Sequence, residues 1–218
     1  MDRKLAIKLR KFGRICPITG YKEESIRVGA SVIVRTDRGE EFGHIVAYMR
    51  GLPRAVAKDV RLKKVLRYAT DEDIAIAENL GQKEDEALLI GAKKAKEYEL
   101  PIHIINVEYI FDKSRVIFYY KVEEGKKLPS FRDFGRDLAK AIGIKVDLEQ
   151  VSPRDEARIL GGLGPCGRPL CCAAWLEKPR HVTVKMVKDQ GIQISALKTS
   201  GLCGRLMCCL QYEYEGGE

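Results

Sequence analysis

Two short cysteine motifs in the C-terminal third of the chain are the residues whose types and spacing point to chemistry. Residues 164–172 read GPCGRPLCC and residues 201–209 read GLCGRLMCC, so both copies share the pattern C-G-R-x-x-C-C. Six of the seven cysteines lie in these two stretches. Thiolates are soft ligands that bind zinc and iron–sulfur clusters. The duplication therefore predicts one metal centre held by both motifs.

The spacing within each motif singles out four of the six cysteines as ligands. Neighbouring cysteines rarely bind the same metal, because their Cα–Cβ bonds diverge. The predicted ligands are Cys166, Cys171, Cys203 and Cys208. The other two, Cys172 and Cys209, are expected to be spare, buried or shared with a partner. In each motif the glycine after the first cysteine permits a tight turn, and the arginine after it is expected to offset thiolate charge.

Four thiolates fit either a [4Fe–4S] cluster or a tetrahedral zinc ion. The C-x4-C spacing lies at the outer limit for zinc sites, whereas the irons of a cluster are several ångströms apart and tolerate wider spacing. The spacing thus favours the cluster, with zinc as the alternative and a metal-free protein as the third reading. Isolated Cys16 is expected to be a structural, buried cysteine.

Groups that would support catalysis are scattered along the chain. His44, His103 and His181 are far apart in sequence, and neither a nucleophile elbow nor a phosphate-binding glycine loop is present. A thiol–disulfide oxidoreductase would use C-x-x-C, which the chain lacks. We therefore predict that the protein is not an enzyme.

Nucleic-acid binding is a separate hypothesis. The chain carries 39 Lys and Arg against 31 Asp and Glu, a formal net charge of +8, so RNA, DNA or an acidic protein is a possible partner. A basic stretch consists of Arg50, Arg54, Lys58, Arg61, Lys63, Lys64 and Arg67. Aromatic residues make up only 7% of the chain, which weakens single-strand recognition by stacking. A zinc-binding nucleic-acid-binding protein is the alternative function.

The strands and helices expected from the sequence, which must position these groups, indicate an α+β protein. Residues 1–66 are expected to form a small β-barrel-like domain, because Leu5, Ile7 and Leu9 alternate with less apolar residues. Two β-branched runs flank the turn at residues 36–39, which is typical of a hairpin.

Residues 67–160 predict a central sheet covered by helices. Thr70 and the acids after it begin a helical segment over residues 70–99, with Gly81 as a potential break. Four more elements are expected after this helix. They are a hairpin of residues 102–111 and 116–122, a helix capped by Ser130 and ended by Gly143, a strand over 144–148, and a short helix from Ser152 to Gly161.

Residues 161–218 form the predicted cysteine-rich segment, packed on the central domain. If residues 170–175 and 206–212 begin helices, the second cysteine of each motif lies near a helix N-terminus, which favours negative charge. Trp175 is expected in a core.

Cellular location follows from what the sequence lacks. There is no secretory signal, and no apolar run approaches the roughly 18–20 residues of a membrane span. An odd number of cysteines argues against disulfides. A cytoplasmic protein is expected.

Several segments resemble a known family. RDEARILGGLGPCGRPLCC, VKMVKDQ and SGLCGRLMCCLQYEYE, with DVRLKKVLRYATDED, VEYIFD and FRDFGRDLAK upstream, are similar to the polymerase-suppressor-type C-terminal domain family and its YaaT/RicT-like bacterial members. The resemblance covers most of the chain and includes all six paired cysteines, so it implies a ligand role for those positions.

The resemblance also implies a function. It suggests a cytoplasmic regulatory adaptor with an iron–sulfur cluster, working in a multiprotein complex. Its expected partners are small helical proteins like RicA and RicF and an RNase Y-type endoribonuclease. The processes implied are RNA processing, sporulation, competence and biofilm formation.

Overall fold

The structure, a computed structural model, describes residues 4–10, 15–19, 27–36, 39–49, 63–123, 125–126, 131–174, 176 and 181–214. The chain divides into two compact units, Met1–Gln150 and Val151–Glu218. The predicted division into segments 1–66, 67–160 and 161–218, with the last packed on the second, stays a prediction.

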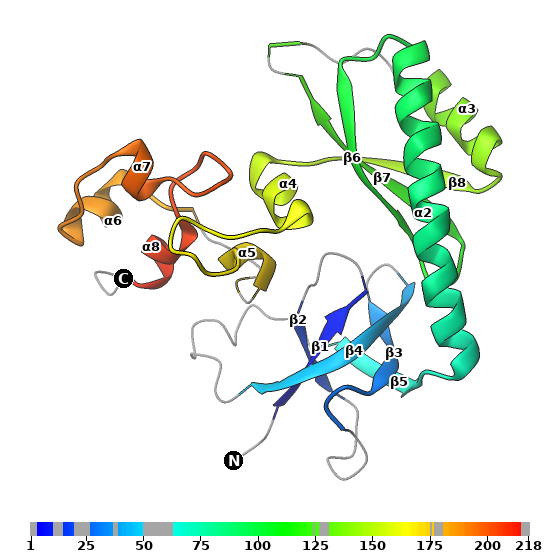
Figure 1. Ribbon diagram of the computed structural model, residues 1–218, viewed down its shortest axis with the longest axis horizontal. Coiled ribbons are helices and arrows are strands. Elements are labelled where there is room, and N and C mark those ends of the chain that lie inside the picture. The colour runs from blue at the N-terminus through cyan, green and yellow to red at the C-terminus, as the bar shows by residue number, and fades with distance from the viewer. Residues whose placement is uncertain are drawn as a thin grey trace. The chain divides into compact units, whose positions relative to one another are not determined.

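The first unit begins with five strands that close into a barrel in the order β1-β2-β5-β3-β4 (Figure 1). The strands are β1 Lys4–Leu9, β2 Ile15–Thr19, β3 Ser31–Thr36, β4 Gly39–Met49 and β5 Lys63–Tyr68. Antiparallel pairing of β1 with β4 closes the barrel, while β2 and β5 pair in parallel. A small β-barrel, part of the fold class predicted from sequence, is therefore present, and its last strand extends to Tyr68.

Alternation of side chains fills the barrel interior, as the period-2 pattern predicts. Its core consists of Ile7, Leu9, Ile18, Val32, Val34 and Ile45. Ala6 is buried as well, and the register between β1 and β4 shifts between Ala6 and Ile7. The predicted hairpin forms, with Thr36 paired to Gly39, whose φ is 133°.

The rest of the first unit is a three-stranded sheet, in the order β6-β7-β8, with two helices. These elements are α2 Asp71–Glu97, β6 Ile102–Tyr109, β7 Arg115–Val122, α3 Arg132–Ile142 and β8 Lys145–Gln150. β6 and β7 form the predicted antiparallel hairpin. β8 runs parallel to β7, as the helical connection between them allows.

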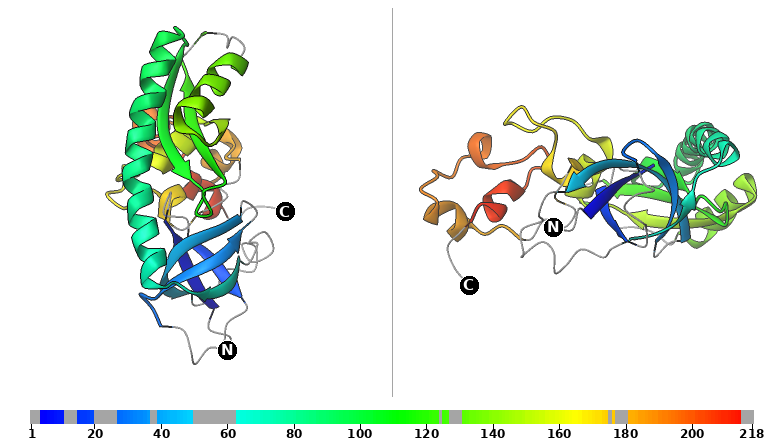
Figure 2. Two further views of the ribbon diagram at one scale, coloured as in Figure 1. Left: turned by 90° about the vertical axis from the view of Figure 1, so that its right-hand side faces the viewer. Right: turned by 90° about the horizontal axis from the view of Figure 1, so that it is seen from below.

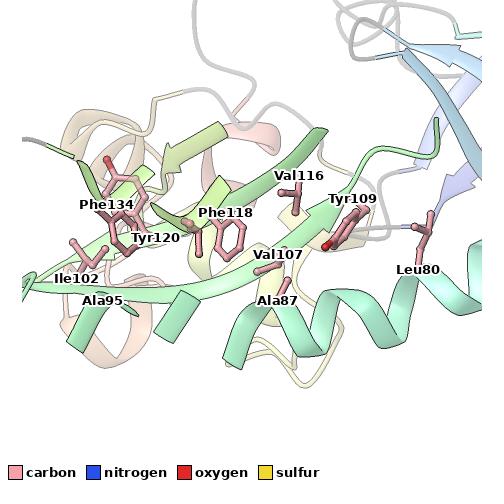
Figure 3. Packing of buried hydrophobic residues seen from close by; sticks show 11 residues of the cluster. Leu80, Ala87, Ala95, Ile102, Val107, Tyr109, Val116, Phe118, Tyr120 and Phe134 are labelled. Carbon is pink, nitrogen blue, oxygen red and sulfur yellow. The ribbon is translucent and has the colours of Figure 1, made fainter. Parts of the chain in front are cut away.

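Both helices bury their apolar side chains against the sheet in one continuous core (Figure 3). The core consists of Leu80, Ala87, Ala95, Ile102, Val107, Tyr109, Val116, Phe118, Tyr120, Phe134 and Leu138. The predicted α+β class, with helices covering the sheet, is confirmed.

Helix α2 packs against both the barrel and the sheet (Figure 2). Ala77, in its second turn, belongs to a cluster with Ile33 and Phe42 of the barrel, while Leu80 and the buried residues after it pack on the sheet. The helix continues through Gly81 without a break.

The helix ends follow local sequence rules, with one exception. Thr70 caps α2 in a capping box with Asp73, and Gly143 ends α3 in the left-handed conformation, at φ 76°. Ser130, the predicted cap of α3, lies outside the described residues. The N-cap position is Phe131, which makes no side-chain capping bond.

The second unit is built from short helices. They are α4 Pro153–Leu160, α5 Cys171–Ala174, α6 Val184–Asp189, α7 Ala196–Thr199 and α8 Cys208–Tyr212. Ser152 caps α4 and Gly161 ends it, as predicted. A small core of Val182, Val187 and Leu210 holds α6 and α8 together. Throughout the described part of the chain, the helices are all too short or too polar to span a membrane.

Candidate metal centre

Each cysteine motif is framed by a small hairpin, and the two hairpins have the same geometry. Leu163 pairs with Pro169 in the first motif, and Ser200 pairs with Leu206 in the second. These positions correspond in the sequence repeat, so the duplication in sequence is also a duplication in structure.

The hydrogen bonds inside the two hairpins also correspond. The N–H of Gly164 donates to the carbonyl of Arg168 at 2.8 Å, and the N–H of Gly201 donates to that of Arg205 at 2.8 Å. Each bond ties together the chain on either side of the first cysteine.

The glycine that follows the first cysteine supplies the turn. Gly167 and Gly204 have φ values of 74° and 72°, a region that side chains with a Cβ rarely adopt. Their N–H groups donate to the carbonyls of Gly164 and Gly201, each at 2.9 Å. The tight turn expected from sequence is therefore present twice.

The second cysteine of each motif begins a short helix. Cys171 is the first residue of α5 and Cys208 is the first residue of α8. Both helices fall within the residue ranges in which the sequence predicted them.

All six paired cysteines line one cavity of about 60 Å³ within the second unit. The predicted ligands Cys166, Cys171, Cys203 and Cys208 are therefore brought together, and Cys172 and Cys209 lie beside them. Cys166 is exposed and the other five are partly buried. The rest of the wall is apolar or glycine, except for Arg154. Over the described residues, no three His, Cys, Asp or Glu side chains form a group that would hold a single metal ion.

The thiols influence one another across the two motifs. Burial raises the pKa of four of them, Cys171, Cys172, Cys208 and Cys209. Cys208 raises the pKa of Cys171 further, and Cys203 raises that of Cys172. Because metal ligands must be deprotonated, metal binding at these buried thiols would release protons.

A basic residue outside both motifs faces the cysteines. Arg154 on α4 lines the cavity, and its positive charge lowers the pKa of Cys208, against the larger effect of burial. The charge of Arg158, and to a smaller extent that of Arg154, lowers the pKa of Cys172 in the same way. The motif arginines that were expected to offset thiolate charge, Arg168 and Arg205, are exposed and do not line the cavity. Sequence reasoning missed Arg154 because only folding brings α4 to the motifs.

Other residues singled out from sequence lie elsewhere. His181 is exposed and does not line the cavity. Arg67 of the basic stretch pairs with Asp73 of α2. The predictions for Trp175, for the side chain of Cys16 and for most of the basic stretch (Arg50, Arg54, Lys58 and Arg61, and the side chain of Lys63) fall outside the described residues.

Comparison with known proteins shows the class to which this fold and these motifs belong. Residues 63–151 match the model of the PSP1 C-terminal conserved region, and residues 181–216 match that of the third domain of PSP1-like proteins. The chain belongs to the PSP1 family. The first matched region spans β5 to β8, and the second contains the second cysteine motif.

Among individual relatives, the chain is 43% identical over 217 residues to the stage 0 sporulation protein YaaT of Bacillus subtilis (strain 168). The match covers 98% of this chain and 76% of YaaT. The YaaT-like resemblance inferred from the cysteine motifs is thereby confirmed.

A more distant relative is an uncharacterised protein of Schizosaccharomyces pombe, 24% identical over 154 residues, or 59% of this chain and 20% of that protein. No solved structure matches the chain at a significant level.

Proposed function

We propose that this chain is a non-enzymatic regulatory protein that holds a [4Fe–4S] cluster between its two cysteine motifs. The observation that carries the proposal is the convergence of six thiols, from two hairpins of the same geometry, on one cavity. A repeated ligand loop is the expected way for one chain to surround a shared inorganic group.

The chemistry of the wall suits this group. Six cysteines and the thioether of Met207 line the cavity, whereas His, Asp and Glu are absent from its wall in the described part of the chain. An all-thiolate set is typical of iron–sulfur clusters and of structural zinc. Cys166, Cys171, Cys203 and Cys208 would be the ligands. Cys172 and Cys209 would stay free or be shared with a partner.

Anaerobic purification tests the cofactor. The protein should carry iron and acid-labile sulfide in equal amounts and absorb visible light through sulfur-to-iron charge transfer. A colourless protein with one zinc per chain would instead favour the zinc alternative. A protein that binds neither metal, with its thiols intact, would contradict a metal centre of any kind.

The regulatory part of the proposal rests on relatedness. The name of the Bacillus relative connects that protein with sporulation, and the similarity extends over nearly all of this chain. We infer a role in developmental control (sporulation, competence and biofilm formation) through RNA processing. The site would act in the cytoplasm, where thiols stay reduced, within a complex of small RicA- and RicF-like helical proteins and an RNase Y-type endoribonuclease.

Cluster loss supplies a means of regulation. The motif hairpins are short and their cysteines partly exposed, so a metal that crosslinks them would order their surface, and its removal would loosen it. Affinity purification of the tagged chain tests this idea. The endoribonuclease should co-purify with the cluster-loaded chain. The amount that co-purifies should fall after the cluster is removed.

The closed five-stranded barrel and the net charge of +8 favour RNA binding as a second candidate function. RNA held through phosphate contacts should bind more weakly as salt increases, with a steep logarithmic slope. Absence of binding to single-stranded or duplex RNA at low salt would remove this candidate.

A further inference from the structure

The cavity lined by the cysteines has one charged group in its wall, and that group is incompletely bonded. Arg154 lies in the first turn of α4, and its Nε atom is buried without a hydrogen-bond partner among the described residues. A buried donor on a charged group that lacks an acceptor costs free energy. Since the Arg154 side chain lines the cavity, a group bound there would supply the acceptor that the described residues lack.

In the next arginine along the same helix, Arg158, the Nε atom is likewise buried with no hydrogen bond among the described residues, but Arg158 differs in its charge partner and its position. Nη2 of Arg158 lies 2.9 Å from Oδ1 of Asp155, so its charge is compensated within α4. Arg158 is also not among the residues that line the cavity. Of the two arginines, Arg154 is the one that lines the cavity, although the charge of Arg158 also reaches Cys172.

We propose that Arg154 donates a hydrogen bond to, and neutralises, the negatively charged metal–thiolate group that the two motifs hold. This inference rests on the proposed metal centre. The acceptor is a sulfur atom, either a cysteine thiolate or an inorganic sulfide. Arg154 is therefore a positioning and charge-compensating residue outside the ligand set.

Two properties of the bound group should depend on Arg154. Hydrogen bonds and charges around metal ligands control how tightly the metal is held, and losing one typically weakens affinity about 10- to 100-fold. A nearby positive charge also stabilises the more negative, reduced state of a cluster. Removing it should move the midpoint reduction potential to more negative values.

The test compares Arg154→Met, Arg154→Lys and the matched control Arg168→Met, each loaded anaerobically with iron and sulfide. Arg168 belongs to the first motif but is exposed and outside the cavity wall. The readouts are iron and sulfide per chain, the rate of iron loss to a chelator, and the midpoint potential. Arg154→Met should lose iron about tenfold faster or more and show a more negative potential, while Arg168→Met should match wild type.

Arg154→Lys separates charge from hydrogen bonding. Lysine keeps the positive charge but has no Nε donor of the same geometry, so its potential should stay near that of wild type while iron loss accelerates. If Arg154→Met does not fold, the rate of iron loss from Arg154→Lys tests the proposal. A rate equal to that of the wild-type protein contradicts it.

The outcomes distinguish this inference from the one on which it rests. One outcome is that the wild-type protein loads its cluster while Arg154→Met equals it in both the rate of iron loss and the midpoint potential. That result overturns the role of Arg154 but not the proposal of a cluster. Equal effects of Arg154→Met and Arg168→Met would likewise overturn it, because net charge alone would explain them. A wild-type protein without metal overturns both.

Discussion

Arg10 and Glu84 form an ion pair that is buried on the Glu84 side and partly exposed on the Arg10 side, with Nη2 of Arg10 only 2.6 Å from Oε1 of Glu84. Arg10 directly follows β1 of the barrel, and Glu84 lies on α2 with a side chain only 2% exposed. The same carboxylate accepts a hydrogen bond of 2.9 Å from the N–H of Tyr109, the last residue of β6. One carboxylate therefore ties together barrel, helix and sheet.

Replacing this carboxylate should destabilise the first unit strongly. Glu84→Ala leaves the N–H of Tyr109 without its acceptor and leaves the Arg10 guanidinium with the carbonyl of Tyr109 but no carboxylate, and breaking a buried ion pair costs about 3–5 kcal/mol. The free energy of unfolding, measured by chemical denaturation, should fall by about 3 kcal/mol. Glu78→Ala is the control, because Glu78 is an exposed residue of the same helix, and its change should stay within about 0.5 kcal/mol. Equal losses from both variants would contradict the role of Glu84.

Two glycines of α2 should respond in opposite directions to alanine. A Cβ on Gly91 would lie 2.6 Å from Cε1 of Phe118 and 2.7 Å from Cδ1 of Ile104, whereas a Cβ on Gly81 would meet nothing within 4 Å. Alanine favours a helix by about 1 kcal/mol over glycine, but overpacking typically costs about 1–3 kcal/mol.

Gly81→Ala should therefore raise the melting temperature, because it gains helix propensity without a clash. Gly91→Ala should lower it, because α2 must move away from the sheet. Thermal unfolding followed by circular dichroism measures both. An increase in both variants would mean that α2 does not pack against β6 and β7 as closely as the structure describes.

Acid should selectively remove the contribution of Asp73 to stability. Hydrogen bonding from Arg67, and from the backbone N–H of Thr70, holds the pKa of Asp73 well below its usual range. The folded state thus favours the charged carboxylate. Its contribution is complete above the unfolded pKa of about 3.9 and is lost as the pH falls toward the folded value.

The variant Asp73→Asn tests whether the stability contributed by Asp73 decreases as the pH falls. At pH 7 it should be about 1–2 kcal/mol less stable than wild type, since a helix cap and a charge-assisted hydrogen bond are both weakened. Near pH 3 the difference should shrink, because wild type has begun to lose the same interaction. Asp71→Asn, at an exposed position of the same turn, is the control, and at pH 7 it should cost much less stability than Asp73→Asn. A constant difference between Asp73→Asn and wild type across this range would contradict the assignment.

Local features of the fold were predictable because local residues determine them. The cap at Thr70 and the turn between Thr36 and Gly39 need only a few neighbours. The parallel pairing of Ile18 with Lys63 was not predictable, since it joins residues far apart in sequence without a local pattern. The continuity of α2 through Gly81 depends on tertiary packing on both sides of that glycine, which outweighs its low helix propensity.

The candidate site divides in the same way. The spacing of the cysteines was enough to predict that the two motifs converge, because the repeat itself implies a shared ligand. It was not enough to find Arg154, whose proximity to the thiols arises from the packing of α4 beside them. The motif arginines looked suitable in sequence, yet Arg168 and Arg205 project to solvent. Very short helices such as α7 could not be predicted, because four residues are too few to show a helical pattern of apolar side chains.

The choice of ligands gives the last prediction. Serine at Cys166, Cys171, Cys203 or Cys208 should each abolish the cluster, whereas Cys16→Ser should not. The hairpin geometry relates Cys166 to Cys203 and Cys171 to Cys208, so the members of each pair should lose iron and sulfide to the same extent. Iron and sulfide per chain, measured after anaerobic loading, provide the comparison.

Cys172 makes this test demanding. Its thiol is close enough to Cys203 for their charges to interact, so proximity alone does not exclude it from the ligand set. Cys171 and Cys172 are adjacent, however, and two adjacent side chains rarely reach one metal. Cys172→Ser and Cys209→Ser should therefore keep their cluster. If either loses it as completely as Cys171→Ser does, the motifs bind through their third cysteines, and the geometric choice of ligands is wrong while the shared centre remains.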